Sequence, residues 1–235
     1  MQPCRVLTPL SAGACLAHLL LWVILVLPSE HVFAQAAQCP DPGTGCPSIS
    51  SSGIPLAPNA HVIIQVIGSP TSAQMTDLQN AVNTANGTAI AVANNNTFTL
   101  STTVTSAFTI NFNTTVTAPD EIGGGLNTSN SSGYLTSNNI LIFLGALNCG
   151  PRGTYLQCFN SSAAGYDNAI QAVATHEFLH MLGYPDVNAN MGTIMGAFNG
   201  TNTVNNSATT PNKCDNTAAS IMRAWQSQGN ICAAH

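Results

Sequence analysis

Apolar residues between positions 61 and 86 first follow a strand-like spacing and then a helical one. The segment His61–Ile67 is dense in Val and Ile, which predicts a buried strand. Residues 69–71, Ser-Pro-Thr, carry the start signals of a helix, and Asn86-Gly87 carries its stop signal. The apolar stripe of this predicted helix consists of Met75, Leu78, Ala81, Val82 and Ala85.

The middle of the chain predicts mainly β-structure. Between residues 89 and 117, β-branched residues alternate with polar ones, which predicts two or three strands. The Gly- and Ser-rich stretch from Gly123 to Gly133 predicts a loop. Ile140–Leu144 predicts another buried strand, and residues 149–166 are expected to form a disulfide-tied hairpin or loop.

Two helices are expected in the last third of the chain. One begins near Asp167 or Asn168 and runs to Leu182, and the other covers about 216–227. The order strand, helix, strands, helix, helix predicts an α+β fold. The roughly 200 residues involved are enough for a single domain with a substantial core.

Residues 1–36 have the layout of a secretory signal peptide. Arg5 supplies the positive charge, Leu16–Leu27 forms the apolar run, and Ala34-Gln35-Ala36 fits a cleavage site, with cleavage after Ala34 as the alternative. The apolar run is too short for a membrane span. We therefore expect a secreted protein, extracellular or periplasmic, that begins with an extended segment over residues 37–60 rich in Pro, Gly and Ser.

The chain is poor in charge. Charged residues make up 6% of it and the formal net charge is −5, whereas an average globular domain is about a quarter charged. Such a surface lacks the cationic groups that neutralise nucleic-acid phosphates or bind anionic lipids. We expect neither nucleic acid nor, after signal cleavage, a membrane as a partner, and we expect a monomer.

Six cysteines follow the predicted signal peptide, and an even number indicates disulfides in an exported chain. They fall into three couples of sequence neighbours, and we predict pairing within each couple. The predicted disulfides are Cys39–Cys46, Cys149–Cys158 and Cys214–Cys232.

The segment His176-Glu177-Phe178-Leu179-His180 carries the candidate chemistry of the chain. Two histidines four residues apart on a helix lie on the same face, so both imidazoles can reach one metal ion. Glu177 lies beside the first histidine, where its carboxylate can reach a water molecule bound to that ion. The motif also arises by chance in helices, with surface or capping histidines, but the residues that follow favour a zinc site.

The third ligand is identified by elimination. Gly183 can take the left-handed conformation that ends a helix, and Pro185 discourages another helical turn. The chain therefore turns back, and Asp186 can offer a carboxylate oxygen. The only other acidic residue after His180 is Asp215, which precedes an apolar-periodic run and is better explained as a helix N-cap. Three protein ligands with an open fourth position are typical of catalytic zinc.

The pattern His-Glu-x-x-His-x-x-Gly-x-x-Asp over residues 176–186 resembles the zinc-binding pattern of metzincin endopeptidases, which have His in the last position. Aspartate there is the variant of snapalysin-like secreted bacterial metzincins. The resemblance is specific over about 168–198 and implies one catalytic Zn²⁺ that serves to hydrolyse peptide bonds in a protein or peptide substrate. The implied zinc ligands are His176, His180 and Asp186, and the implied general base is Glu177.

The resemblance also implies a Met-turn, a tight loop that places a methionine beneath the metal. Thr193–Phe198 resembles this loop, which makes Met195 the candidate, with Met191 as the alternative. Both methionines could also simply fill gaps in the core. Some metzincins carry a tyrosine two residues after that methionine, and this chain departs from them with Ala197.

A metzincin-like fold implies one catalytic domain over 61–235, with a twisted mixed β-sheet, an active-site helix, the Met-turn and a C-terminal helix. The zinc cleft would divide an upper part (61–182) from a lower part (183–235). Substrate in this family lies extended along an edge strand, and we expect residues 155–159 to form it. Cys39-Pro40-Asp41 faintly resembles the cysteine switch of some metzincin zymogens, which is an alternative to a disulfide at Cys39.

A different class of protein is compatible with the same motif. A secreted or surface binding protein could retain the zinc fold without catalysis, and low charge with abundant Asn and Thr suits a cell-surface protein. The intact Glu177 favours the enzyme, because a non-catalytic relative would be free to lose it. A zinc protease of another fold is disfavoured because no glutamate follows His180.

Overall fold

A computed structural model of the chain describes residues 39–43, 45–113, 123–143, 163–188, 193–196, 209–228 and 232. The chain divides into two units, Met1–Gln35 and Ala36–His235, and all described residues belong to the second. The predicted signal peptide therefore lies outside the described residues. The same holds for Cys149, Cys158, Met191, Ala197 and the expected substrate strand 155–159.

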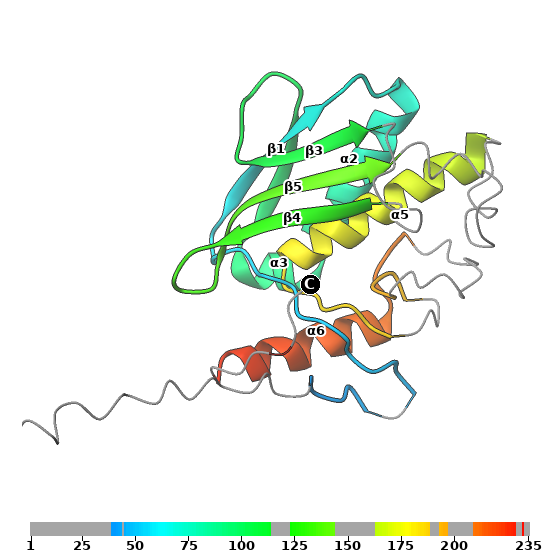
Figure 1. Cartoon of the computed structure of the whole chain (residues 1–235). Helices are drawn as coiled ribbons and strands as arrows, with labels where there is room; N and C mark the ends of the chain where they lie inside the picture. The colour runs from blue at the N-terminus through cyan, green and yellow to red at the C-terminus, as the bar shows by residue number, and fades with distance from the viewer. Residues whose placement is uncertain are drawn as a thin grey trace, which may run out of the picture. The chain divides into compact units, whose positions relative to one another are not determined.

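Five strands form one mixed sheet in the order β2-β1-β3-β5-β4 (Figure 1). β1 pairs in parallel with β2 and β3, β3 pairs in parallel with β5, and β4 runs antiparallel to β5 at one edge. Together with four helices among the described residues, this mixed content agrees with the predicted α+β class. The strands are β1 His61–Ile67, β2 Thr97–Ser101, β3 Phe108–Asn113, β4 Gly123–Ser129 and β5 Leu135–Phe143.

Strand β1 lies where it was predicted, but it is buried on one face only. Val62, Ile64 and Val66 are at most 5% exposed. Ile63 and Ile67, which alternate with them, are 41% and 38% exposed. Alternate side chains of a strand point to opposite faces, so one face of the sheet packs against the core and the other meets solvent.

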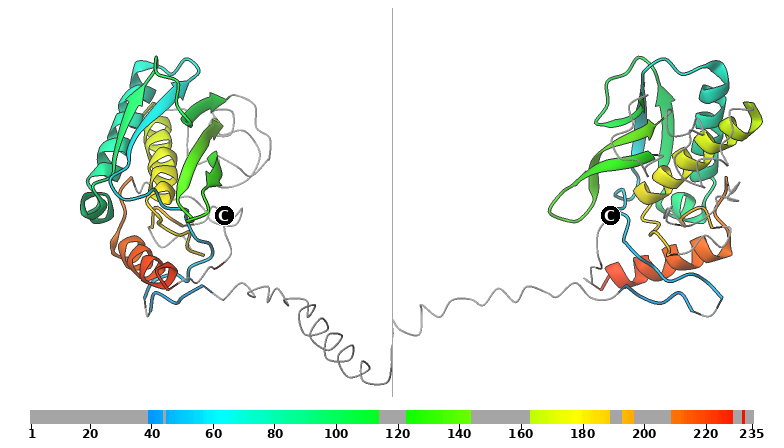
Figure 2. Two further views of the ribbon diagram at one scale, coloured as in Figure 1. Left: turned by 90° about the vertical axis from the view of Figure 1, so that its left-hand side faces the viewer. Right: turned by 45° about the vertical axis from the view of Figure 1, so that its right-hand side comes forward.

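Helices α2 (Ser72–Asn86) and α5 (Ala163–Met181) pack against each other on one side of the sheet (Figure 2). α2 spans the segment that was predicted for it. The Phe178 ring of α5 stacks on Phe98 of β2, with 5.6 Å between the ring centroids. Core packing of this kind fixes α5 against the sheet. Among the described residues, no helix combines the length and the apolar character needed to cross a membrane.

One helix occupies a segment for which only strands were predicted. Between residues 89 and 117 the structure has the strands β2 and β3, but it also has the short helix α3 (Ala89–Asn94). Thr88 caps its start by accepting a hydrogen bond from the Ala91 N–H. Asn95, with φ of 52°, ends it in the left-handed conformation. Thr88 and Asn95 are local signals of the start and end of a helix. The prediction missed them because the β-branched residues of this segment favoured strands.

Strand β4 occupies a stretch that was predicted to be a loop because of its glycines. Two of these glycines face helix α5. A Cβ added to Gly123 would lie 2.4 Å from Val173 Cγ1, and one added to Gly125 would lie 3.1 Å from Glu177 Oε2. Glycine in a strand commonly marks such a close approach. The missing side chains therefore serve the packing of α5 on β4 rather than a turn.

Helix α6 (Lys213–Gln226) begins about one turn before the start predicted near residue 216, so Asp215 lies inside the helix. Its N-cap is Asn212, whose side chain accepts hydrogen bonds from the N–H groups of Cys214 and Asp215. Asp215 is thus the third residue of the helix, and its carboxylate accepts a hydrogen bond from the Asn212 N–H at 2.8 Å. The two residues form a capping box, so the prediction that Asp215 is itself the N-cap is wrong.

The disulfides join segments that are far apart in the sequence. Cys39 pairs with Cys232 and Cys46 with Cys214, across 193 and 168 residues of chain. The predicted pairs Cys39–Cys46 and Cys214–Cys232 are therefore wrong. A cysteine switch at Cys39 is excluded as well, because its sulfur is bonded to Cys232. The fold, rather than proximity in sequence, decides the pairing, since the N-terminal segment runs back to the C-terminal helix.

Candidate metal centre

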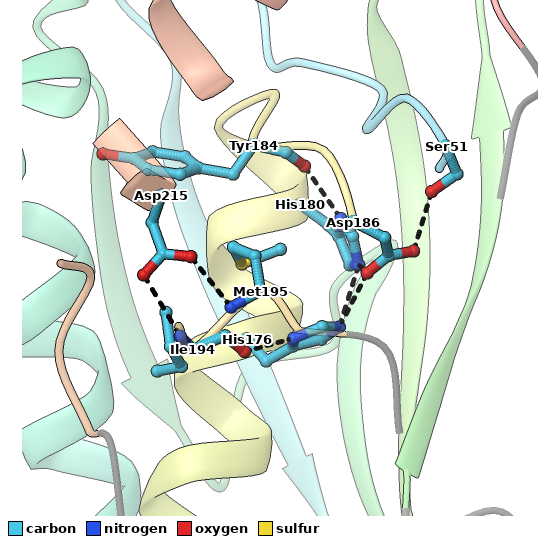
Figure 3. A network of polar contacts seen from close by, with 8 residues as sticks. All are labelled: Ser51, His176, His180, Tyr184, Asp186, Ile194, Met195 and Asp215. Carbon is cyan, nitrogen blue, oxygen red and sulfur yellow. Dashed lines mark hydrogen bonds and ion pairs between the residues drawn. The ribbon is translucent and has the colours of Figure 1, made fainter. Parts of the chain in front are cut away.

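Helix α5 places two histidines next to each other near its C-terminal end (Figure 3). His176 and His180 are buried, and their Nε2 atoms are 3.0 Å apart. Residues four apart share one face of a helix, which directs both rings to one point. Phe178 and Leu179, which lie between them in the sequence, are fully buried in the core. The same helix thus anchors itself in the core and presents two imidazoles.

The end of α5 turns the chain back towards these histidines. Gly183 has φ of 86°, a conformation that favours glycine. The Gly183 N–H donates to the His180 carbonyl at 2.9 Å, and the Tyr184 N–H donates to the Leu179 carbonyl at 3.0 Å. This pair of bonds is a Schellman motif, and it ends the helix at the predicted glycine. Asp186 follows within reach of both rings.

The three predicted ligand atoms form a nearly equilateral triangle. Asp186 Oδ1 lies 3.3 Å from His176 Nε2 and 3.1 Å from His180 Nε2, and all three residues are buried. A tetrahedral zinc ion with bonds of roughly 2.0–2.1 Å separates its ligand atoms by roughly 3.3–3.4 Å. The triangle therefore fits a small divalent cation such as zinc to within a few tenths of an ångström.

Backbone carbonyls hold the other nitrogen of each ring. His176 Nδ1 lies 2.8 Å from the Ile194 oxygen, and His180 Nδ1 lies 2.9 Å from the Tyr184 oxygen. A carbonyl oxygen only accepts hydrogen bonds, so each Nδ1 carries a proton. In a neutral ring, Nε2 then presents its lone pair to the centre. Two such lone pairs 3.0 Å apart repel each other unless a cation, either a proton or a metal ion, lies between them.

The charges of the centre favour a cation. Burial by itself lowers the pKa of His176, but the hydrogen bond and the negative charge of Asp186 outweigh burial and raise this pKa to about 9. Burial by itself raises the pKa of Asp186, yet the two histidines hold it well below its usual range. The negative potential that attracts a proton to these atoms attracts a divalent metal ion in the same way.

Glu177, the predicted general base, is a buried carboxylate beside this triangle. Only 6% of its surface is exposed. It follows His176 directly in the chain, and its charge helps to raise the pKa of that histidine. Its Oε2 atom lies so near strand β4 that a Cβ at Gly125 would be 3.1 Å away. Glu177 thus lies close both to the candidate ligands and to the edge strand of the sheet.

The loop 193–196 that contains Met195 contacts the site through its backbone. Besides the Ile194 carbonyl that holds His176, the Met195 carbonyl accepts a hydrogen bond from the Val187 N–H at 2.9 Å. Asp215 fixes the loop by accepting from the N–H groups of Ile194 and Met195, at 3.1 and 3.2 Å. Burial raises the pKa of Asp215, although these donors act in the opposite direction. No local sequence pattern indicates this second role of Asp215.

The N-terminal segment contacts Asp186, the third candidate ligand, directly, and sequence analysis missed this contact. The Ser51 hydroxyl donates to Asp186 Oδ2 at 2.7 Å (Figure 3). The Ser50 N–H donates to the Asp186 carbonyl at 2.9 Å, and Ile49 forms an antiparallel bridge with Val187. No local pattern in this segment, which has the composition of an extended lead-in, could have indicated these contacts.

The structure brings the predicted ligands, the predicted base and the predicted turn residues into one region. Comparison with protein-family models, with curated proteins and with solved structures gives no match to this chain. The chemistry of the centre is therefore argued from its own residues. Those that lie in this region are His176, Glu177, His180, Gly183, Asp186 and Met195.

Proposed function

We propose that this chain is a secreted zinc-dependent endopeptidase. The observation that carries the proposal is the ligand triangle, in which two imidazole nitrogens and one carboxylate oxygen lie 3.0, 3.1 and 3.3 Å apart. Both imidazoles are already committed through Nδ1 to backbone carbonyls, as metal-ligating histidines usually are. The proposed zinc ligands are His176, His180 and Asp186, and the proposed general base is Glu177.

The residues of the centre divide the chemistry between them. A zinc ion held there would supply Lewis acidity, which lowers the pKa of a water molecule and polarises the scissile carbonyl. Glu177 accepts the proton of the attacking water and passes it to the leaving amine. The backbone carbonyls of Ile194 and Tyr184 accept the Nδ1 protons of the two rings, which orients each Nε2 towards the position that the ion would occupy. Asp186 adds a negative charge that a third histidine would not add, so the metal should be a weaker Lewis acid.

We assign residues 61–235 to a metzincin-like domain as part of this proposal. It is supported by the mixed sheet with an antiparallel edge strand, and by a helix that carries both histidines and ends at Gly183. The buried Met195 loop, which bonds to His176 through the Ile194 carbonyl, supports it further. In this assignment Met195 is the Met-turn residue.

The proposed substrate is an extended peptide that pairs with the edge strand β4. An edge strand presents unpaired backbone N–H and C=O groups, which can bind an extended chain as an additional strand. Among the described strands, β2 and β4 form the two edges of the sheet, and β4 is the one that approaches Glu177, at Gly125. β4 replaces residues 155–159 as our candidate for this part.

Export is proposed from two independent features. The first 36 residues have the pattern of a cleavable signal peptide. Two disulfides join distant parts of the chain, and such bonds form and persist in oxidising compartments outside the cytosol.

The substitution Glu177→Gln tests the catalytic assignment. It keeps the shape of the side chain but removes the proton acceptor, so cleavage of casein or of a peptide library should fall about 10²- to 10⁴-fold. Zinc content, measured by elemental analysis, should stay at the wild-type level. A wild-type protein that cleaves peptides should also lose activity with a zinc chelator and regain it with added zinc.

Two results would contradict the proposal, one its assignment of the base and the other its catalytic activity. Cleavage by Glu177→Gln at the wild-type rate would exclude this residue as the base. A wild-type protein that binds zinc but cleaves nothing in the library would support the alternative, a non-catalytic secreted or surface binding protein that retains the zinc-protease fold.

A further inference from the structure

We propose that Ser51 is a positioning residue of the metal centre, which holds the carboxylate of Asp186 in the orientation that a metal ion needs. The inference rests on the zinc function proposed above. The Ser51 hydroxyl lies 2.7 Å from Asp186 Oδ2. The other carboxylate oxygen, Oδ1, is the one that lies 3.1 and 3.3 Å from the two histidine Nε2 atoms. Ser51 therefore occupies one oxygen and leaves the other for the metal.

The Asp186 side chain depends more than the two histidines on a hydrogen-bond partner that fixes its orientation. Each imidazole is held by the helix and by a carbonyl at Nδ1, whereas Asp186 lies in a loop and the terminal torsion of an aspartate is only loosely restricted. Asp186 is also only 6% exposed, so water can satisfy Oδ2 poorly. A hydroxyl from elsewhere in the chain meets both needs. It orients the carboxylate and prevents both oxygens from turning towards the ligand triangle.

The backbone around Ser51 is held firmly enough for this task. The Ser50 N–H donates to the Asp186 carbonyl at 2.9 Å, and the Asn188 N–H donates to the Ser48 carbonyl at 2.8 Å. These two bonds form a short antiparallel ladder between the N-terminal segment and the loop of the third ligand. The segment of Ser51 is thus already paired through its backbone with the loop of Asp186. The two residues are 135 positions apart in the sequence.

Three variants of the full-length mature protein separate the hydroxyl from the backbone around it. Ser51→Ala removes the hydrogen bond, Ser51→Thr keeps a hydroxyl, and Ser50→Ala is the matched control. Ser50 contacts Asp186 through its backbone N–H, which alanine retains. Zinc affinity is measured by competition with a chromophoric chelator. We expect Ser51→Ala to bind zinc about 10- to 100-fold more weakly than wild type. Ser51→Thr and Ser50→Ala should stay within about threefold of it.

A spectroscopic measurement on the Co²⁺-substituted proteins adds a readout that a general loss of stability would not change. Loss of the Ser51 bond frees Asp186 Oδ2 to approach the metal, so the visible absorption of the Ser51→Ala protein should weaken and shift as its coordination number rises. Ser51→Thr should keep the wild-type spectrum.

The outcomes separate this inference from the function on which it rests. If wild-type protein binds zinc tightly and Ser51→Ala binds it equally well with an unchanged Co²⁺ spectrum, Ser51 is not a positioning residue, and the zinc centre stands. If Ser51→Thr fails as badly as Ser51→Ala, the hydroxyl is not the cause, and the inference is likewise overturned. If wild-type protein does not bind zinc at all, the proposed function falls, and the inference falls with it.

Discussion

The two sides of the candidate metal centre are built in different ways. On one side, His176 and His180 belong to a single helix, and local helical geometry together with core packing sets their positions. On the other side, Asp186 lies in a loop that is held by segments distant in the sequence. The Ser51 hydroxyl reaches it across 135 residues, and the neighbouring Val187 bonds to the Met195 carbonyl. The helix sets most of the geometry of the two rings, with one tertiary contact at His176 Nδ1 from the Ile194 carbonyl, whereas the position of Asp186 depends mainly on distant segments.

This difference predicts how the two sides respond to change. Damage to the helical side should remove metal ligands without unfolding the protein, because α5 is anchored in the core by residues other than the histidines. Damage to the loop side should lower both the stability and the metal affinity, because the same contacts hold the N-terminal segment and position Asp186.

The largest expected effect belongs to the helical side. His180→Ala removes one of the three proposed ligands, so zinc affinity should fall by more than about a hundredfold. This loss exceeds the one expected when a residue that only hydrogen-bonds a ligand, such as Ser51, is removed. Far-UV circular dichroism should show that the helices remain. His61→Ala is the matched control, because His61 is exposed on β1. A His180→Ala protein that binds zinc within threefold of the control would contradict the ligand assignment.

The next effect belongs to the loop side. The double substitution Cys46→Ser with Cys214→Ser removes the disulfide that ties the N-terminal segment to α6. The free energy of unfolding, measured by denaturant titration, should fall by about 2–4 kcal/mol. Zinc affinity should fall too, because Cys46 lies only five residues before Ser51.

The second disulfide provides the control for this comparison. Replacing Cys39 and Cys232 with serine should cost a similar free energy but should affect zinc binding less, because Cys39 lies twelve residues before Ser51. Equal zinc affinity in the two double variants would show that the Cys46–Cys214 bond does not help to position the segment.

The smallest of these effects concerns the crossing of the N-terminal segment over the end of α5. A Cβ added to Gly53 would lie 2.6 Å from the Tyr184 carbonyl oxygen and 2.8 Å from that of His180. Both atoms are backbone and cannot move away easily, so Gly53→Ala should lower the free energy of unfolding by about 1–3 kcal/mol. Gly124→Ala on β4 is the control, because a Cβ there meets nothing within 4 Å. Equal stability of the two variants in denaturant would rule out this close packing.

The same division separates what sequence could predict from what it could not. Strand β1 and helix α2 were predicted correctly because their apolar spacing and end signals are local. Strand β4 was missed because its glycines suggest a loop unless the approach of Val173 from α5 is known. The disulfides were paired wrongly for a similar reason, since sequence neighbours were preferred to partners 168 and 193 residues away.

The candidate site follows this pattern residue by residue. His176, His180 and Gly183 could be placed from helical spacing and a helix-ending glycine, and Asp186 from elimination. Ser51 could not be found, because a serine in a segment rich in Pro, Gly and Ser carries no signal of its distant partner. Asp215 was noticed, but only its capping role is local, whereas its bonds to the loop of Met195 depend on how the chain folds back.

Anomalous diffraction at the zinc edge, from crystals of the mature protein grown with zinc, tests the central claim most directly. The account predicts one strong peak with two imidazole nitrogens and one carboxylate oxygen at about 2.0–2.2 Å. These atoms should be His176 Nε2, His180 Nε2 and Asp186 Oδ1. A zinc ion bound elsewhere, or an Asp186 carboxylate directed away from the two rings, would contradict it.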